Sequence, residues 1–134
     1  MNLFLDDMRK PAAVRWVEDF PQLVNWQVVR TYQEFVDKVL AEGVPRRASF
    51  DHDLAEEHYQ EYLRTLKSND FRYEAMQEKT GRDALKWLLE HCAEKNLPRP
   101  QVWFHTMNGE GKRNMESLVK SFDKVHPHLI PSES

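Results

Sequence analysis

Short segments rich in β-branched and aromatic residues alternate along this chain with longer segments whose apolar residues recur every three or four positions. The short segments are typical of buried strands, because each is brief and is bounded by polar or turn-forming residues. Four strands are predicted, over NLFLDD (2–7), WQVVRT (26–31), RASFDHDL (47–54) and QVWFHT (101–106).

The longer segments predict three amphipathic helices. Thr31 followed by Glu34, and Thr80 followed by Asp83, match the capping box that begins a helix. Gly43 then ends the first of these helices. The three apolar stripes comprise Tyr32, Phe35, Val36, Val39 and Leu40; Ala84, Leu85, Leu88, Leu89 and Cys92; and Met115, Leu118, Val119, Phe122 and Val125.

Four further segments complete the prediction. One short helix is expected over residues 12–19, and a helical insertion over residues 55–79, where charge and aromatic residues are frequent. Two glycines predict a loop over residues 108–111. Two prolines and small polar residues predict a frayed tail over residues 127–134.

Strands that are separated by helices imply right-handed crossovers and a parallel sheet. We therefore predict an α/β fold with an open parallel sheet of four strands flanked by helices, formed by residues 1–134 as one domain. In such sheets, ligands bind at the carboxyl ends of the strands, near the point where the strand order reverses.

Composition narrows the classes of function. A net charge of -3 argues against a general DNA-binding surface, although a local basic pocket is compatible with it. The single cysteine, Cys92, excludes a disulfide framework and a cysteine zinc site, and is typical of a reducing compartment. No signal peptide and no apolar run of membrane-spanning length are visible, so we expect a cytoplasmic protein without a membrane partner.

Acidic and histidine residues follow three of the four strands. They are Asp6 and Asp7 after the first, Asp51, His52 and Asp53 after the third, and His105, Thr106 and Asn108 after the fourth. Aspartates at strand ends are often only turn formers. Here, however, the three ends should meet at one edge of the sheet, and clustered carboxylates repel unless a cation or a proton intervenes.

A hard divalent ion, Mg²⁺ or Mn²⁺, suits such a cluster because it prefers oxygen ligands. The predicted metal ligands are Asp6, Asp7, Asp51 and Asp53. A zinc site built from the histidines is the weaker alternative, because no H-E-x-x-H spacing is present.

His105 allows two interpretations. It follows an apolar strand and is either a hydrogen-bonded core histidine or a general acid or base. The segment after it carries Gly109 and Gly111 directly before Lys112 and Arg113. Backbone N–H groups of glycines and of a helix N-terminus attract anions, so this segment is expected to bind phosphate, although it lacks the P-loop spacing.

Five motifs occur in order: LFLDDMRKP (3–11), SFDHDL (49–54), TGRD (80–83), HTMN (105–108) and GKRNM (111–115). With them the chain resembles the cyclic-phosphate-processing receiver-like domain, a divergent branch of the response-regulator receiver superfamily. The resemblance implies a receiver/flavodoxin-like fold, a metal-binding acidic pocket and the processing of cyclic phosphate bonds.

The resemblance also implies residue roles. Asp6, Asp7 and Asp51 match the metal-binding acids, with Asp51 at the phospho-acceptor position, and His105 takes the place of the receiver's Ser or Thr. The positions specific to the branch are His52, Asp53, Asn108 and Asn114. An ordinary receiver has a fifth strand that ends in a lysine, and here Lys112 or Arg9 is left to supply that charge.

The first predicted function is a metal-dependent phosphoesterase acting on a cyclic phosphate, either a 2′,3′-cyclic RNA end or a cyclic nucleotide. The ligand is thus a phosphate-containing small molecule or an RNA end. The catalytic residues would be His105, His52 and Asp51, with His58 as an alternative to His52. The substrate-binding residues would be Asn108, Gly109, Gly111, Lys112 and Asn114.

The alternative is a non-catalytic receiver-like module that binds a ligand or signals, with Asp51 as a phospho-acceptor. The missing fifth-strand lysine counts against the phosphorylated form of this alternative. The sequence gives no indication of the oligomeric state.

Overall fold

The computed structural model of the chain describes residues 1–52 and 80–132. The helical insertion predicted over residues 55–79 lies outside these residues, as do Asp53 and His58.

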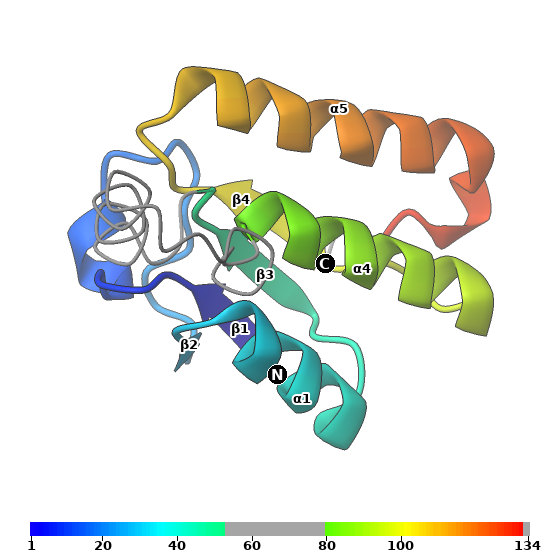
Figure 1. Cartoon of the computed structure of the whole chain (residues 1–134), viewed down its shortest axis with the longest axis horizontal. Helices are drawn as coiled ribbons and strands as arrows, with labels where there is room; N and C mark the ends of the chain where they lie inside the picture. Colours follow the sequence, from blue (N-terminus) through cyan, green and yellow to red (C-terminus); the bar gives the residue numbers. More distant parts are fainter. Residues whose placement is uncertain (53–79, 133–134) are drawn as a thin grey trace, which may run out of the picture.

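The centre of the molecule is a parallel sheet, which confirms the predicted fold class (Figure 1). Its strands are β1 (Asn2–Leu5), β2 (Gln27–Val29), β3 (Arg47–Phe50) and β4 (Gln101–Phe104), in the order β2-β1-β3-β4. β1 pairs with β2 on one side and with β3 on the other, so the strand order reverses between β1 and β3. Each strand is shorter than predicted, although the first residue after β1, β3 and β4 still donates its N–H to the neighbouring strand.

Three helices cover one face of the sheet: α1 (Tyr32–Glu42), α4 (Gly81–Lys95) and α5 (Gly109–Val125) (Figure 1). Their apolar stripes pack on Leu3 and Leu5 of β1 and on Ala48 and Phe50 of β3, which alternation along the strands places on the same face. The helices therefore bury the larger core.

The two predicted capping boxes differ in the structure. Thr80 accepts from the Asp83 N–H and Asp83 accepts from the Thr80 N–H, so this box is complete. Thr31 caps α1 through the Glu34 N–H, but the Glu34 carboxylate accepts from the Arg30 N–H instead of closing the box.

The opposite face of the sheet is covered by the connection from β1 to β2. Phe4 packs there against Val14 and Phe20, with Trp26 and Trp103 at the edge of this smaller core. The helix predicted over residues 12–19 is wrong: only the 3-10 turn η1 (Pro11–Val14) forms. Aromatic packing onto Phe4 holds the rest of the segment in an irregular path, and Asp19 is left-handed with φ 58°.

The carboxyl-terminal segment is ordered further than predicted. Residues Pro127–Leu129 form the 3-10 turn η2, and Leu129 is buried in the larger core. Its carbonyl accepts from the Arg99 N–H at 2.9 Å. Residues 127–129 are therefore not a frayed tail, because one apolar side chain anchors them.

Cys92 lies in the larger core on α4, and burial raises the pKa of its thiol to about 11. Because the thiolate is the reactive form, we expect the native protein to react with Ellman's reagent at pH 8 far more slowly than the unfolded chain. The absorbance at 412 nm with and without guanidinium measures both rates. Equal rates would contradict the burial.

No helix among the described residues is long and apolar enough to cross a bilayer.

Candidate metal centre

Three carboxylates meet where the strand order of the sheet reverses. Asp6 and Asp7 follow β1 and Asp51 follows β3, and one oxygen-ligand atom from each lies within 4.8 Å of the others. Leu5 pairs with Phe50 in the parallel register, so Asp6 and Asp51 leave neighbouring strands side by side. The carboxylates line a hollow of about 180 Å³, called here the acidic hollow. Its lining residues are Asp6, Asp7, Met8, Arg9, Asp51, Thr106 and Met107.

The Asp6 carboxylate is held by the backbone that follows it. Its Oδ1 accepts from the N–H groups of Met8 and Arg9, both at 2.8 Å. Burial opposes its ionisation, but the contact with His105 and these two N–H donors outweigh burial, so the pKa of Asp6 lies below its ordinary value. Asp6 is therefore a pre-formed carboxylate at neutral pH.

Arg30 fixes the same turn from the neighbouring strand end. Its Nη1 donates to the carbonyl oxygens of Asp6 at 3.1 Å and of Arg9 at 2.8 Å. Arg30 is not among the site residues predicted from the sequence. Its only signal was its position directly after β2, at the same edge of the sheet as the acids.

His105 lies behind Asp6 and is completely buried. Its Nδ1 shares a hydrogen bond of 2.6 Å with Ser49 Oγ, and its ring stacks on Phe4 with centroids 4.2 Å apart. Its Nε2 lies 3.2 Å from Asp6 Oδ2. Although Ser49, His105 and Asp6 follow the order of a catalytic triad, Ser49 is also completely buried and cannot meet a substrate.

The catalytic role predicted for His105 stays a prediction, and the structure supports the core interpretation of its position. Burial lowers its pKa more than Asp6 raises it, so the imidazole is neutral at neutral pH. Its Nε2 lies next to Oδ2 of Asp6, a residue that lines the acidic hollow, but His105 itself does not line the hollow.

We expect His105→Ala to lower the free energy of unfolding by roughly 2–4 kcal/mol, because it leaves a cavity and removes the partner of the buried Ser49 hydroxyl. Urea unfolding followed by fluorescence measures this change. His128→Ala, an exposed histidine, is the control and should change it by less than about 0.5 kcal/mol. Equal effects of the two substitutions would contradict a supporting role of His105.

The pH dependence of stability provides a second measurement on the same residue. The pKa of His105 in the folded state lies below its ordinary value of 6.5, so unfolding takes up a proton as pH falls below 6.5 and stability is lost. Asp6 acts in the same direction, but only below its ordinary value of 3.8. Between pH 7 and 5 we therefore expect the EDTA-treated wild type to lose more stability than His105→Ala. Parallel curves would contradict this assignment.

His52 lies between the beginnings of two helices. Its carbonyl accepts from the Gly81 N–H at 2.9 Å, and its ring packs against Gly111, where a Cβ would lie 2.5 Å from Cγ. His52 is not among the residues that line the acidic hollow. Its catalytic role stays a prediction, and its observed contacts join β3 to α4 and α5.

The glycine loop predicted over residues 108–111 is wrong, because α5 already begins at Gly109. Asn108 is its N-cap and accepts from the Gly111 N–H at 2.9 Å, so this N–H is already paired. Thr106 Oγ1 in turn accepts from the Asn108 N–H at 3.1 Å. Asn108 and Gly111 therefore form the helix start, and Gly111 also makes room for His52.

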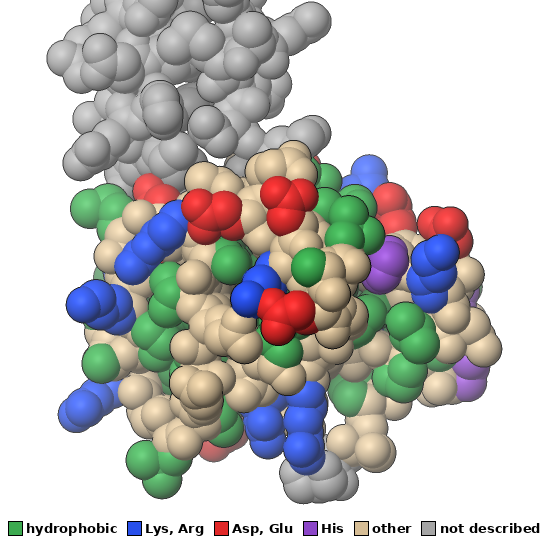
Figure 2. Space-filling model, turned by 90° about the horizontal axis from the view of Figure 1, so that it is seen from below, with side chains coloured by type: hydrophobic (Ala, Val, Ile, Leu, Met, Phe, Trp, Pro, Cys, Tyr) green, Lys and Arg blue, Asp and Glu red, His purple; other side chains and the backbone are tan. Residues whose placement is uncertain are grey.

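The other predicted substrate residues are spread along α5. Gly109, Lys112 and Asn114 are exposed and do not line the acidic hollow. Of the two cations considered in place of the receiver lysine, Arg9 lines the hollow and Lys112 does not. Figure 2 shows one face of the molecule, on which basic side chains are spread among acidic and hydrophobic ones.

The three acids could hold a divalent cation. Asp6 Oδ2 supports this fit, because it is buried and is not aligned for a hydrogen bond with His105 Nε2, although the two atoms are 3.2 Å apart. A carboxylate oxygen without a hydrogen bond is costly to bury. A hard cation with carboxylate ligands would compensate that cost. The fourth predicted ligand, Asp53, lies outside the described residues.

One comparison with known proteins agrees with this geometry. No curated protein and no solved structure gave a significant match. A family model described as the Cyclic-phosphate processing Receiver domain matches residues 1–121, which is most of the chain. The parallel sheet, the acids at its switch point and this match together show that the chain belongs to the cyclic-phosphate processing receiver domain family.

Proposed function

We propose that this protein is a divalent-cation-dependent phosphoesterase that opens a cyclic phosphate. The observation that carries the proposal is the convergence of Asp6, Asp7 and Asp51 in a hollow large enough for an ion and a phosphate group. Membership of a family associated with cyclic-phosphate processing supports the choice of substrate.

Asp6, Asp7 and Asp51 would hold the cation, Mg²⁺ or Mn²⁺. When bound, such an ion neutralises charge on the phosphate oxygens and lowers the pKa of a water that it binds. Two N–H donors hold the Asp6 carboxylate in place, so its position does not depend on the ligand.

Arg9 would bind the phosphate in the same hollow. One of its N–H groups donates to the His105 carbonyl at 3.1 Å, which holds the guanidinium at the site. A guanidinium has five N–H donors, so donors remain for phosphate oxygens. Thr106 also lines the hollow, and its hydroxyl would add another hydrogen-bond donor.

A non-catalytic receiver-like module is the second candidate, and one observation favours it. Among the described residues, no histidine lines the acidic hollow, so none of them places an imidazole there as a general acid or base. Asp51 follows β3 directly and shares the hollow with Arg9 and Thr106, as a phospho-acceptor would.

One assay separates the two candidates. The purified protein is incubated with Mg²⁺ or Mn²⁺ and a panel of 2′,3′-cyclic and 3′,5′-cyclic phosphates, and products are separated by chromatography. The enzyme is expected to open at least one substrate only when the ion is present, and EDTA should stop the reaction. No turnover on any substrate, together with a phosphoryl mass increase on Asp51 after treatment with acetyl phosphate, would favour the module instead.

A further inference from the structure

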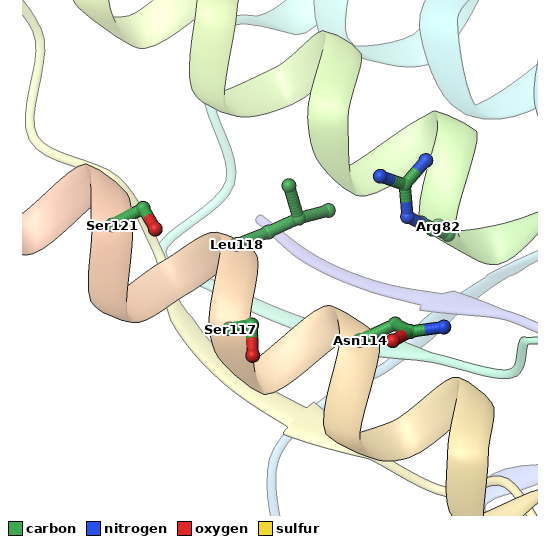
Figure 3. Close-up of a pocket in the computed structure, with 5 residues that line it drawn as sticks. All are labelled: Arg82, Asn114, Ser117, Leu118 and Ser121. Atoms are coloured by element: carbon green, nitrogen blue, oxygen red, sulfur yellow. The ribbon is translucent and has the colours of Figure 1, made fainter.

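A second hollow lies between α4 and α5 and is called here the α4/α5 groove (Figure 3). It has a volume of about 340 Å³ and is lined by Arg82, Asn114, Ser117, Leu118 and Ser121. Arg82 and Asn114 lie toward the beginnings of the two helices, and the serines continue along α5 (Figure 3). The groove is thus a separate site from the acidic hollow, and it contains one of the predicted substrate residues, Asn114.

The chemistry of the groove favours an oxyanion. Its polar side chains are a guanidinium, an amide and two hydroxyls, all of which donate hydrogen bonds, and none of its lining residues is acidic. Arg99 differs from Arg82, because the charge of its guanidinium is already matched by a bidentate ion pair with Asp123 at 2.7 and 2.8 Å. Arg82 has no such ion pair among residues 1–52 and 80–132, although its side chain is half-buried.

Contacts of His52 connect the start of the groove to the strand end that carries Asp51. His52, the residue after Asp51, accepts from the Gly81 N–H directly before Arg82. The ring of His52 packs on Gly111, one helical turn before Asn114. Both sides of the groove therefore start at the residue that follows the central acid. A ligand with its terminal phosphate in the acidic hollow would extend past His52 into the groove.

We propose that the α4/α5 groove binds the phosphodiester upstream of the reacting cyclic phosphate, so that the substrate is the 2′,3′-cyclic end of an RNA and not a free cyclic mononucleotide. Arg82 would pair with a backbone phosphate oxygen, Asn114 and the serines would donate to phosphate or sugar oxygens, and Leu118 would contact the apolar side of the sugar or base. The inference rests on the proposed function and names its substrate class.

The first test compares substrates of one, two and four nucleotides that each end in a 2′,3′-cyclic phosphate. For the wild type, KM is expected to fall about tenfold from one nucleotide to four, as for one charge-assisted hydrogen-bond pair. Arg82→Gln should remove most of this ratio, and Arg82→Lys should restore part of it because lysine keeps the charge without the bidentate fork. Lys86→Gln, one turn further along α4 and outside the lining of the groove, is the matched control and should keep the ratio. A wild-type KM that does not depend on length would overturn the proposal.

The second test needs neither turnover nor the cation. Fluorescence anisotropy measures binding of a labelled tetraribonucleotide with a 3′-hydroxyl end in EDTA. Arg82→Gln should bind about tenfold more weakly than Lys86→Gln, with a shallower dependence on salt. If this difference in affinity appears but no cyclic phosphate is opened, the proposed function is wrong and RNA binding by the groove is supported. If cyclic phosphates are opened but Arg82→Gln binds RNA as Lys86→Gln does, or if a phosphoserine peptide binds through Arg82 and RNA does not, the groove proposal is wrong.

Discussion

Asp51→Asn is expected to abolish cation-dependent opening of a cyclic phosphate, with a loss of at least about 100-fold in kcat/KM. Mutation of a residue that only supports a metal ligand typically lowers metal affinity or activity by about 10–100-fold. Removal of a charged ligand should therefore lower activity by about 100-fold or more. Asn keeps the shape of the side chain and removes its charge. Asp51 belongs to the acid cluster and lines the hollow, so its substitution would weaken binding of the cation and shift its position.

The control for this prediction is Asp37→Asn, an exposed aspartate of α1 whose carboxylate accepts from the Gln33 amide one turn earlier. Activity of this variant should equal that of the wild type. Isothermal titration with Mn²⁺ gives a readout that does not depend on turnover: heat of binding should disappear for Asp51→Asn and remain for Asp37→Asn. Full activity and full Mn²⁺ binding in Asp51→Asn would place the cation elsewhere.

The convergence of the acids could be predicted because it depends on chain direction alone. Four parallel strands place all their carboxyl ends on one edge of the sheet, so Asp6 and Asp51 were expected at the same edge, and the observed pairing of β1 with β3 places them side by side. The helix starts at Thr31 and Thr80 were equally predictable, since a capping residue acts on neighbours three positions away.

The placement of His105 could not be predicted in the same way, because it depends on what covers the second face of the sheet. The His105 N–H still bonds to the Phe50 carbonyl at 3.0 Å, so the alternation of β4 continues for one residue and turns the ring to the side of Phe4. Residues 8–26 close that side with irregular structure, which carries no periodic signal. A site histidine and a core histidine therefore look alike in the sequence.

The reason for glycine at two positions could not be predicted from the sequence for a related reason. Gly81 and Gly111 are both buried, and neither has a positive φ that would require glycine. They are needed for space: backbone and ring atoms of Asp51 and His52 occupy the positions where their Cβ atoms would lie. Such a contact joins residues that are distant in sequence, so a motif such as TGRD shows that glycine is present but not which chain segment it approaches.

Gly81→Ala tests this close approach and is expected to lower the free energy of unfolding by about 3 kcal/mol or more, the upper range of overpacking. A Cβ on Gly81 would lie 1.5 Å from the Asp51 carbonyl oxygen, a backbone atom that can move only with the end of β3. The strain would therefore reach the acidic hollow as well as the core, so Mn²⁺ affinity should fall together with stability. Urea unfolding and isothermal titration measure the two effects.

Gly109→Ala is the matched control, because Gly109 also occupies the first position of a helix but its Cβ would meet only the flexible Arg113 Nη1, at 3.4 Å. Both substitutions change helix propensity in the same way, by at most about 1 kcal/mol in favour of alanine. The difference between the two variants thus isolates the contact of Gly81 with Asp51. Similar stability of both variants would mean that β3 and α4 do not approach this closely in solution, and the position assigned to Asp51 would have to be revised.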